Sequence, residues 1–388
     1  MCRWFAYISS SEPCLLEDVL VTPAHSLSKQ VHEHYLPKLL SHDPSIHAEH
    51  TTQAEITTRN RLFNVDGFGM AWYTGVLTTF TPNQHESHAA KPNLHPALYK
   101  TIQPPLHDSN FRSICSNTSS KVVFAHIRAA TATAITPTNN HPFTFGIHTI
   151  MHNGYISDFA KIKRKMCEAM TQEAYEHIQG GTDTEHFAAL LMSYLCPTQT
   201  KTTPNPYSGE EGESAFPASW EEYHTPEQLK DALFKTIATI IKIQASVLED
   251  RAQPNDLNIA ATDGRSLVAC RFRNHATEQP PSLYYSNTAG VTMNRQYPDH
   301  PDGVKGPHGK GNGKSVNGKT AAKGAEGHNP HASRNAGEHG EHFIIASEPT
   351  TYKDSEWTLI EKNRVLLVGN GKLIGIEPVG YPGDGKSS

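Results

Sequence analysis

The order in which strand-like and helix-like segments follow one another constrains the fold of this chain more than any other feature. Strand-like segments come first, at 2–9, 68–73, 121–130 and 145–154. Helix-like segments follow, at 157–178, 183–195 and 225–249. Strand-like segments then return, at 257–272, 282–286, 342–347 and 364–379. A parallel sheet needs strands and helices to alternate, so this order favours antiparallel sheets covered by helices.

Short-range signals mark the ends of several segments. Thr225-Pro226-Glu227-Gln228 is typical of a helix start, with a Thr cap, a Pro in the first turn and a Gln three residues after the cap. Asp263-Gly264 predicts the turn of a hairpin over 257–272, and Gly369-Asn370-Gly371 predicts another over 364–379. The proline-rich residues 81–119 and the polar residues 198–224 are expected to be loops.

Composition excludes several classes of protein. The 388 residues carry 34 basic and 39 acidic side chains, a net charge of −5, which argues against a generally basic nucleic-acid binder. No apolar run of about 18 residues exists, so no membrane span is expected, and the first residues do not resemble a signal peptide. The six cysteines form no CxxC pair, which predicts a reducing, cytoplasmic setting.

The chain is expected to form one domain over residues 2–380. Residues 298–340 are rich in Gly, Lys, His and Asn and nearly free of large apolar side chains, so they cannot bury enough surface to offset their ordering entropy. We predict that this segment is a flexible insertion between two strands of the domain. A disordered tail is predicted at 381–388.

Cys2, directly after Met1, is the strongest single candidate for chemistry. Methionine is removed when a small side chain follows it, and the product here would be an N-terminal cysteine. A thiol has a pKa of about 8.5 and an α-amine of about 7.7–8.0, so the amine can accept the thiol proton near neutral pH. One residue would then supply both nucleophile and base. Taken alone, a cysteine at this position is also explained by chance.

Four downstream motifs change that balance. They are Ala125–Thr131 at the end of a buried strand, Asn139–Phe143, His152-Asn153-Gly154, and Gly181–Glu185 at a helix start. Their order behind Cys2 resembles that of the class II glutamine amidotransferases, which are N-terminal-nucleophile hydrolases. The resemblance covers about residues 2–195 and implies a four-layer αββα sandwich of two antiparallel sheets, an α+β fold.

The resemblance also implies a role for each site residue. Cys2 would be the nucleophile, and Asn153 with Gly154 would form the oxyanion hole. Arg128 would bind the α-carboxylate of a glutamyl group and Asp183 its α-ammonium. Thr131 and His141 are weaker candidates that would line the pocket. His126 and His152 are expected to be structural, because an amine base needs no histidine.

Each role has a structural alternative. Arg128 is also explained by a surface ion pair, Asn153-Gly154 by a type I′ turn, and Asp183 by a helix cap. The prediction of an amidohydrolase therefore depends on these site residues together and not on any one of them.

Within the family, three segments most resemble the fungal glutamine-amidotransferase-like subunit of the cytosolic glutathione-degradation complex. They are MCRWFAY, LLEDVLVTPAHSLSKQ and NVDGFGMAWY. In better-known amidotransferases an Arg precedes the corresponding Asp-containing turn, and the segment Phe63–Gly67 lacks it. The departure bears on the lid arrangement and on the preference for free glutamine.

Three functions follow from this branch. The first is hydrolysis of a γ-glutamyl amide through a glutamyl thioester, with glutathione as the favoured substrate and a metallopeptidase-like protein as the implied partner. The second is a glutaminase subunit that feeds ammonia to a separate synthetase. The third is a catalytically silent scaffold that binds partners.

No cofactor, metal, nucleic acid or membrane is expected to take part. Gly313–Thr320 matches the phosphate-loop pattern GxxxxGK[ST], but its flanks are Gly/Lys-rich and supply neither the strand nor the helix that such a loop needs. The paired histidines, His339 and His342 among them, lack a four-ligand set.

Overall fold

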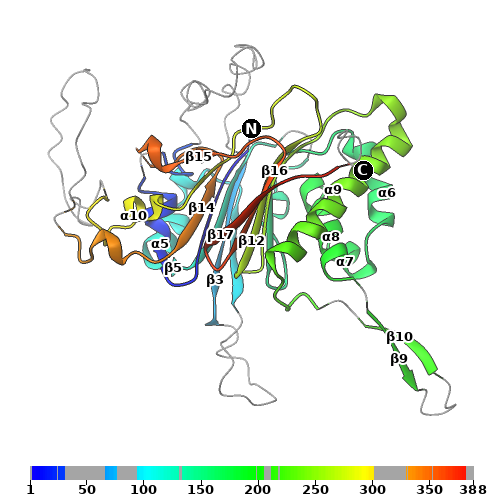
Figure 1. Cartoon of the computed structure of the whole chain (residues 1–388), viewed down its shortest axis with the longest axis horizontal. Coiled ribbons are helices and arrows are strands. Elements are labelled where there is room, and N and C mark those ends of the chain that lie inside the picture. Colours follow the sequence, from blue (N-terminus) through cyan, green and yellow to red (C-terminus); the bar gives the residue numbers. More distant parts are fainter. Residues whose placement is uncertain are drawn as a thin grey trace.

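Two antiparallel sheets lie face to face, and helices cover the outer face of each (Figure 1). The structure is a computed structural model. It describes residues 2–23, 25–30, 66–76, 94–130, 133–197, 199–204, 211–216, 219–300, 329, 331–351 and 353–381. The layer order is helix, sheet, sheet, helix, so the predicted αββα fold class is confirmed.

Sheet 1 contains the first strand of the chain near its middle. Its seven strands, in spatial order, are β15 (Thr358–Leu359), β13 (Tyr284–Ser286), β14 (His342–Ala346), β1 (Arg3–Ser9), β6 (Val122–Arg128), β3 (Gly67–Thr74) and β4 (His95–Thr101). Strand β1 therefore pairs with β14, a strand from the far end of the chain, and with β6.

Sheet 2 packs against sheet 1. Its six strands, in spatial order, are β17 (Lys372–Pro378), β16 (Arg364–Gly369), β12 (Ser266–Arg273), β11 (Asp256–Thr262), β8 (His148–Tyr155) and β7 (Phe143–Phe145). Two short pairs lie outside both sheets, namely β2 (Cys14–Leu15) with β5 (Ser119–Ser120), and β9 (Gln199–Pro204) with β10 (Glu211–Phe216).

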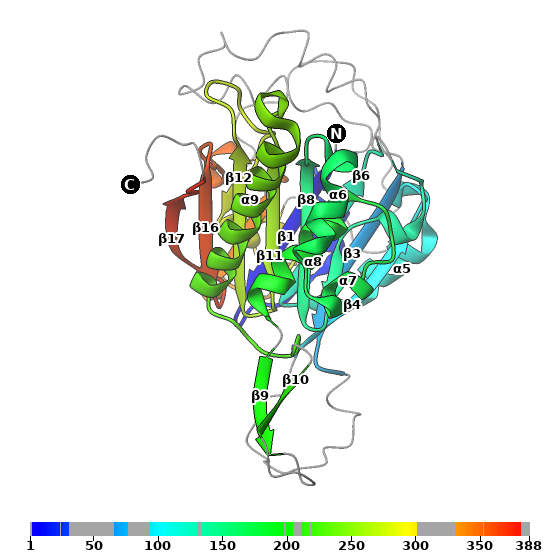
Figure 2. The same ribbon diagram turned by 90° about the vertical axis from the view of Figure 1, so that its right-hand side faces the viewer.

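The helices divide between the two outer faces. Figure 2 shows the larger group in front of sheet 2, namely α6 (Phe159–Glu168), α7 (Gln172–Glu176), α8 (Asp183–Leu195) and α9 (Pro226–Leu248). The smaller group lies on sheet 1, namely α1 (Leu16–Leu20), α5 (Ser109–Asn117) and α10 (Ala289–Met293). No helix in the described part of the chain is long and apolar enough to cross a membrane.

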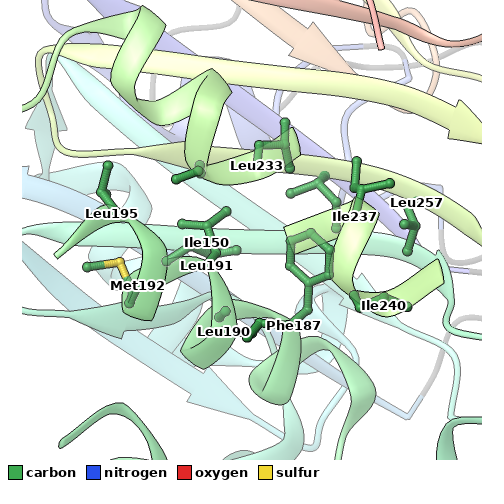
Figure 3. Packing of buried hydrophobic residues seen from close by; sticks show 14 of the residues in the cluster. Ile150, Phe187, Leu190, Leu191, Met192, Leu195, Leu233, Ile237, Ile240 and Leu257 are labelled. Carbon is green, nitrogen blue, oxygen red and sulfur yellow. The ribbon is translucent and has the colours of Figure 1, made fainter. Parts of the chain in front are cut away.

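Three apolar clusters fill the spaces between the four layers. Side chains of β1 alternate, so that Trp4 and Ala6 pack between the sheets while Phe5 and Tyr7 pack under the helices of sheet 1. The third cluster joins sheet 2 to α8 and α9, and Figure 3 shows part of it, with Phe187 of α8 near Ile237 and Ile240 of α9. Strands that are buried on both faces hold the ends of β1, β6, β8 and β11 in fixed positions.

Several predicted boundaries are confirmed. Thr225 and Gln228 form a reciprocal capping box at the start of α9. The hairpin over 257–272 forms from β11 and β12, and that over 364–379 from β16 and β17.

Other predictions were wrong. Residues 81–119, expected to be a loop, contain β4 and α5. Strand β4 lies at the edge of sheet 1, where Pro96 needs no N–H partner, and the Asp108 side chain caps α5 by accepting two backbone hydrogen bonds. The helix expected over 157–178 is divided into α6 and α7, and the loop expected over 198–224 contains β9 and β10.

The ends of the predicted insertion pack onto the domain. Asn329 is buried and its side chain donates to the carbonyls of Arg295 and Tyr297 at 2.7 and 3.2 Å. Arg334 forms a salt bridge of 2.6 Å with Glu12. Residues 301–328 and 330, with the phosphate-loop match, lie outside the described residues, as do 382–388.

Candidate active site

Cys2 lies directly before β1, at the end of the two sheets where β6 and β8 also finish. Its Sγ accepts a hydrogen bond from the Ala129 N–H at 3.3 Å and lies 3.7 Å from the Ala129 carbonyl. Burial raises the pKa of the thiol, and the Ala129 hydrogen bond and the charge of Arg128 act against that shift. A thiol in this setting needs a base before it can attack a carbonyl.

Arg128, at the end of β6, is 4% exposed and points toward polar groups of the following loop. One terminal nitrogen donates to the Ala134 carbonyl at 3.1 Å, and the other donates to Thr133 Oγ1. No carboxylate in the described part of the chain forms a salt bridge with it, so the surface ion pair is the wrong explanation for this residue. A buried guanidinium without a counter-ion is suited to an incoming carboxylate.

Gly67 and Asp66 position the chain around Arg128, at the end of β6. A Cβ on Gly67 would lie 2.3 Å from Asn140 Nδ2, so only glycine lets the loop at 139–141 pack against β3. Asn140 Oδ1 in turn accepts from Arg128 at 3.5 Å. The Asp66 carboxylate accepts the Ala130 N–H at 2.7 Å, which fixes the backbone just after Arg128.

Asn153 and Gly154 lie within β8 and not in a turn, so the type I′ turn is also the wrong explanation. Asn153 pairs with Asn258 of β11 and faces the space between the sheets, where β8 lies against β1 and β6. Its amide oxygen is buried and accepts no hydrogen bond from the described residues. Gly154 has φ +145°, and a Cβ there would lie 2.0 Å from the Asp256 carbonyl, so glycine is required.

Asp183 is the first residue of α8, but Thr182 is the cap. The Asp183 carboxylate accepts hydrogen bonds of 2.8 Å from the N–H groups of Ile156 and Thr184. It thereby ties the start of α8 to the chain just after β8. Among the described residues no cation forms a salt bridge with it, and its charge acts on Arg128, where it opposes the lowering of the pKa by burial.

The three histidines near the site are buried, and burial lowers the pKa of each. His126 Nε2 bonds to the His152 carbonyl at 3.0 Å, and the His126 ring lies against that of His141 at a tilt of 39°, with ring centroids 4.0 Å apart. His152 bonds to Thr184 Oγ1 and to the Asp256 carbonyl. Burial lowers the pKa of His126 to about 3 and that of His141 well below its usual value. None of them hydrogen-bonds to Cys2, and their described partners lie on neighbouring strands and on α8.

Sequence reasoning quoted Asn139 and Glu185 within motifs but gave them no role. Asn139 Oδ1 accepts the Gly181 N–H at 3.0 Å, which joins the loop after Arg128 to the loop before Asp183. Glu185 accepts the N–H groups of Gln179 and Gly180 and so shapes that second loop. Thr131 lies outside the described residues. No group of three or more metal-ligating side chains was found in the described ranges.

The arrangement combines a nucleophile with two opposite, unpaired charges. The charges of Cys2 and of Asp183 both act on Arg128, and neither Arg128 nor Asp183 forms a salt bridge with another described residue. A molecule with an α-carboxylate and an α-ammonium would complement both. The side-chain nitrogen of Asn153 would be the donor for an oxyanion, while the buried atom without a described partner is its amide oxygen.

Comparisons with known proteins bear on the family of the chain. Residues 50–215 match the family model described as "Glutamine amidotransferases class-II". The chain is 28% identical over 370 residues to the probable glutamine amidotransferase DUG3 of Saccharomyces cerevisiae, covering 95% of this chain and 82% of that protein. A segment of 77 residues, 20% of this chain, is 42% identical to the glutamine–fructose-6-phosphate aminotransferase (isomerizing) of Rhizobium leguminosarum bv. viciae and covers 12% of that protein.

A solved structure supports the fold. The glutamine aminotransferase class-II domain protein of Silicibacter pomeroyi superposes with a TM-score of 0.50 and 18% identity, covering 98% of this chain and all of that one. Residues 50–215 therefore carry the match to the class II glutamine amidotransferases, and the chain is similar over nearly its whole length to a probable glutamine amidotransferase.

Proposed function

We propose that the chain is an N-terminal-cysteine amidohydrolase that cleaves a γ-glutamyl amide bond. The observation that carries the proposal is that Cys2 bonds to the residue after Arg128, while Arg128 and Asp183, whose charges act on each other, have no salt-bridge partner among the described residues. The α-carboxylate of a glutamyl group would bind Arg128 and its α-ammonium Asp183. This directs the δ-carbonyl of the substrate toward the sulfur and the Asn153 amide.

The base would be the α-amine that Cys2 gains when Met1 is removed. No histidine or carboxylate of the described residues hydrogen-bonds to the thiol, whose pKa is raised by burial. The amine accepts the thiol proton as the sulfur bonds to the δ-carbon. Asn153 Nδ2 and the Gly154 N–H donate to the oxyanion.

Collapse of the tetrahedral intermediate breaks the C–N bond, and the ammonium returns its proton to the leaving nitrogen. A glutamyl thioester remains on Cys2. Water gives a proton to the amine as it attacks the thioester, and glutamate leaves with the thiol restored.

The leaving group decides the biological role. The resemblance to the fungal subunit of the glutathione-degradation complex supports glutathione as the substrate, in which the γ-glutamyl bond joins Glu to Cys-Gly. It also supports a metallopeptidase-like partner in such a complex. We further propose that residues 2–380 form one domain, supported by the pairing of β1 with β14 across the insertion. All six cysteines are free, which supports a cytoplasmic setting.

The test is glutamate release by the purified full-length protein, after mass spectrometry has established removal of Met1. Glutathione and glutamine are compared as substrates, with and without co-purified partners. Cys2→Ser should lower the rate by ~10⁴-fold or more, while the half-buried Cys167→Ser should leave it unchanged. A processed protein that releases glutamate from neither substrate overturns the proposal, and so does a Cys2→Ser variant as active as wild type.

A further inference from the structure

Asn258 of β11 has a buried acceptor atom with no described donor. The residue is 0% exposed and pairs with Asn153 on the neighbouring strand. Its Nδ2 donates to the carbonyls of Pro281 and Ser282, at 2.9 and 3.4 Å. Two carbonyl acceptors fix the orientation of the amide, so the unpartnered atom is the oxygen. An unsatisfied buried acceptor costs about 1–3 kcal/mol, which points to a donor that binds there.

Asn258 lies close to the start of β1. The Trp4 indole N–H donates to the Asn258 carbonyl at 3.3 Å. Trp4 packs between the sheets, and Cys2 precedes it by two residues, so both side chains lie on the same face of the extended chain. The Asn258 amide and the Cys2 nucleophile therefore share the space between the sheets.

The backbone nitrogen of Cys2 is directed toward the edge of β1 that faces Ser347. The Trp4 N–H donates to Ser347 Oγ at 3.0 Å, and Trp4 accepts from the Ser347 N–H at 2.9 Å. Backbone groups two residues apart in a strand point the same way, which directs the Cys2 nitrogen toward this edge. Ser282, whose carbonyl accepts from Asn258, donates to the Ser347 carbonyl at 2.9 Å.

We propose that Asn258 Oδ1 accepts a hydrogen bond from the α-amino group of processed Cys2 and is a positioning residue for that base. The inference rests on the proposed function. The oxygen binds one N–H of the amine and leaves the lone pair directed at Sγ. After the amine takes the thiol proton, the same oxygen stabilises the ammonium, which then gives a proton to the leaving nitrogen.

Two substitutions at this position form a matched pair. Asn258→Leu and Asn258→Asp both lose the amide nitrogen, but only Asp keeps an acceptor oxygen. Asn258→Leu should lower kcat about 10- to 100-fold, the effect of a lost hydrogen bond to a charged group, with KM within about twofold. Asn258→Asp should stay within about tenfold of wild type. Thr262→Val, at the other end of β11, controls for loss of a buried polar contact and should retain kcat.

The pH profile separates positioning from a structural effect. An ammonium without its acceptor is less stable, so the acidic limb of kcat/KM should move to lower pH in Asn258→Leu. Alkylation of Cys2 by iodoacetamide at pH 7, followed by mass spectrometry, should slow about tenfold because less thiolate forms. A structural loss alone would lower both rates without moving the limb.

Unchanged kcat, limb and alkylation in Asn258→Leu overturn the inference, as does an equal loss in Asn258→Leu and Thr262→Val. Should Asn258→Leu fail to fold, a loss of 100-fold or more in folded Asn258→Asp overturns it. If wild type hydrolyses no γ-glutamyl amide, the proposed function fails, and the alkylation rates alone decide the role of Asn258.

Discussion

The polar side chains buried at the two ends of β11 differ in whether their hydrogen bonds are satisfied. At the end away from Cys2, Thr262 both donates and accepts a hydrogen bond within the following turn. Asp263 accepts three backbone N–H groups at 2.7–2.8 Å. At the end near Cys2, Asn258 and its neighbour Asn153 each keep a buried amide oxygen without a described partner.

The difference separates structure from chemistry more clearly than burial does. A buried polar group with all its partners stabilises the fold, because breaking its bonds leaves unsatisfied atoms. A buried donor or acceptor that lacks a partner costs stability, and in Asn258 we attribute that cost to the proposed bond with the Cys2 amine. We call the Thr262–Asp263 end of β11 saturated, because its side chains have all their hydrogen-bond partners, and the Asn258 end unsaturated. Mutations at the saturated end should therefore change the free energy of unfolding, and mutations at the unsaturated end should change activity.

Asn153→Ala offers the largest test of this contrast. Loss of one oxyanion donor should lower kcat by ~10²–10³-fold. The free energy of unfolding should change little, because the Asn153 side chain has no hydrogen-bond partner among the described residues. Steady-state kinetics of glutamate release and urea unfolding measure the two effects on the same preparation.

Asn153→Asp serves as the control because it keeps the size of the side chain and lacks the N–H donors. It should be as impaired as Asn153→Ala. Activity close to wild type in either variant would remove Asn153 from the oxyanion hole. If the free energy of unfolding fell by as much as the free energy of transition-state binding, Asn153 would behave like Thr262 and Asp263, as a residue that stabilises the fold.

The sequence predicted most of the fold, because most of its signals are local. Alternating apolar residues in β1, the Thr225 cap of α9 and the Asp263-Gly264 turn each act within a few residues. Strand β4 was missed because its prolines favour a loop, and only its place at a sheet edge makes Pro96 acceptable.

The site was predicted less completely. Cys2, Arg128, Asn153 and Asp183 were named from motifs that read along the chain. Their supports depend on contacts between distant segments, such as Gly67 against Asn140 and Asn139 with Gly181. Asn258 has no motif, and only the register of β11 against β8 places it beside Asn153. Tertiary pairing is what the linear pattern does not contain.

Asp263→Ala tests the saturated end. The carboxylate binds the N–H groups of His224, Arg265 and Ser266, so its removal leaves three backbone donors without their acceptor. We expect a loss of about 2–3 kcal/mol in the free energy of unfolding, with kcat unchanged at low temperature. Asp263→Asn keeps one acceptor oxygen and should lose less. A fall in kcat without a fall in stability would break the contrast between the two ends.

The smallest expected effect is the loss of stability in acid, which should be similar at the two ends. Burial lowers the pKa of His126, near Cys2, to about 3 and that of His148, at the opposite end of β8, to about 4. Both stay neutral in the folded protein and gain a proton in the unfolded chain below about pH 6.5. Their stabilisation is complete above that pH and is lost progressively as the pH falls toward 4.

Each of these histidines should lower the free energy of unfolding by about 2 kcal/mol between pH 7 and pH 5, because pH 5 lies about 1.5 units below the pKa of an unfolded histidine. His126→Gln and His148→Gln should each remove about that much of the acid dependence of unfolding, measured by urea denaturation at both pH values. Equal effects at the two ends would show that neutral burial is common to both. If a variant keeps the full acid dependence of wild type, the histidine that it replaces is protonated in the folded protein. The two ends of β11 would then have to be compared in charge as well as in hydrogen bonding.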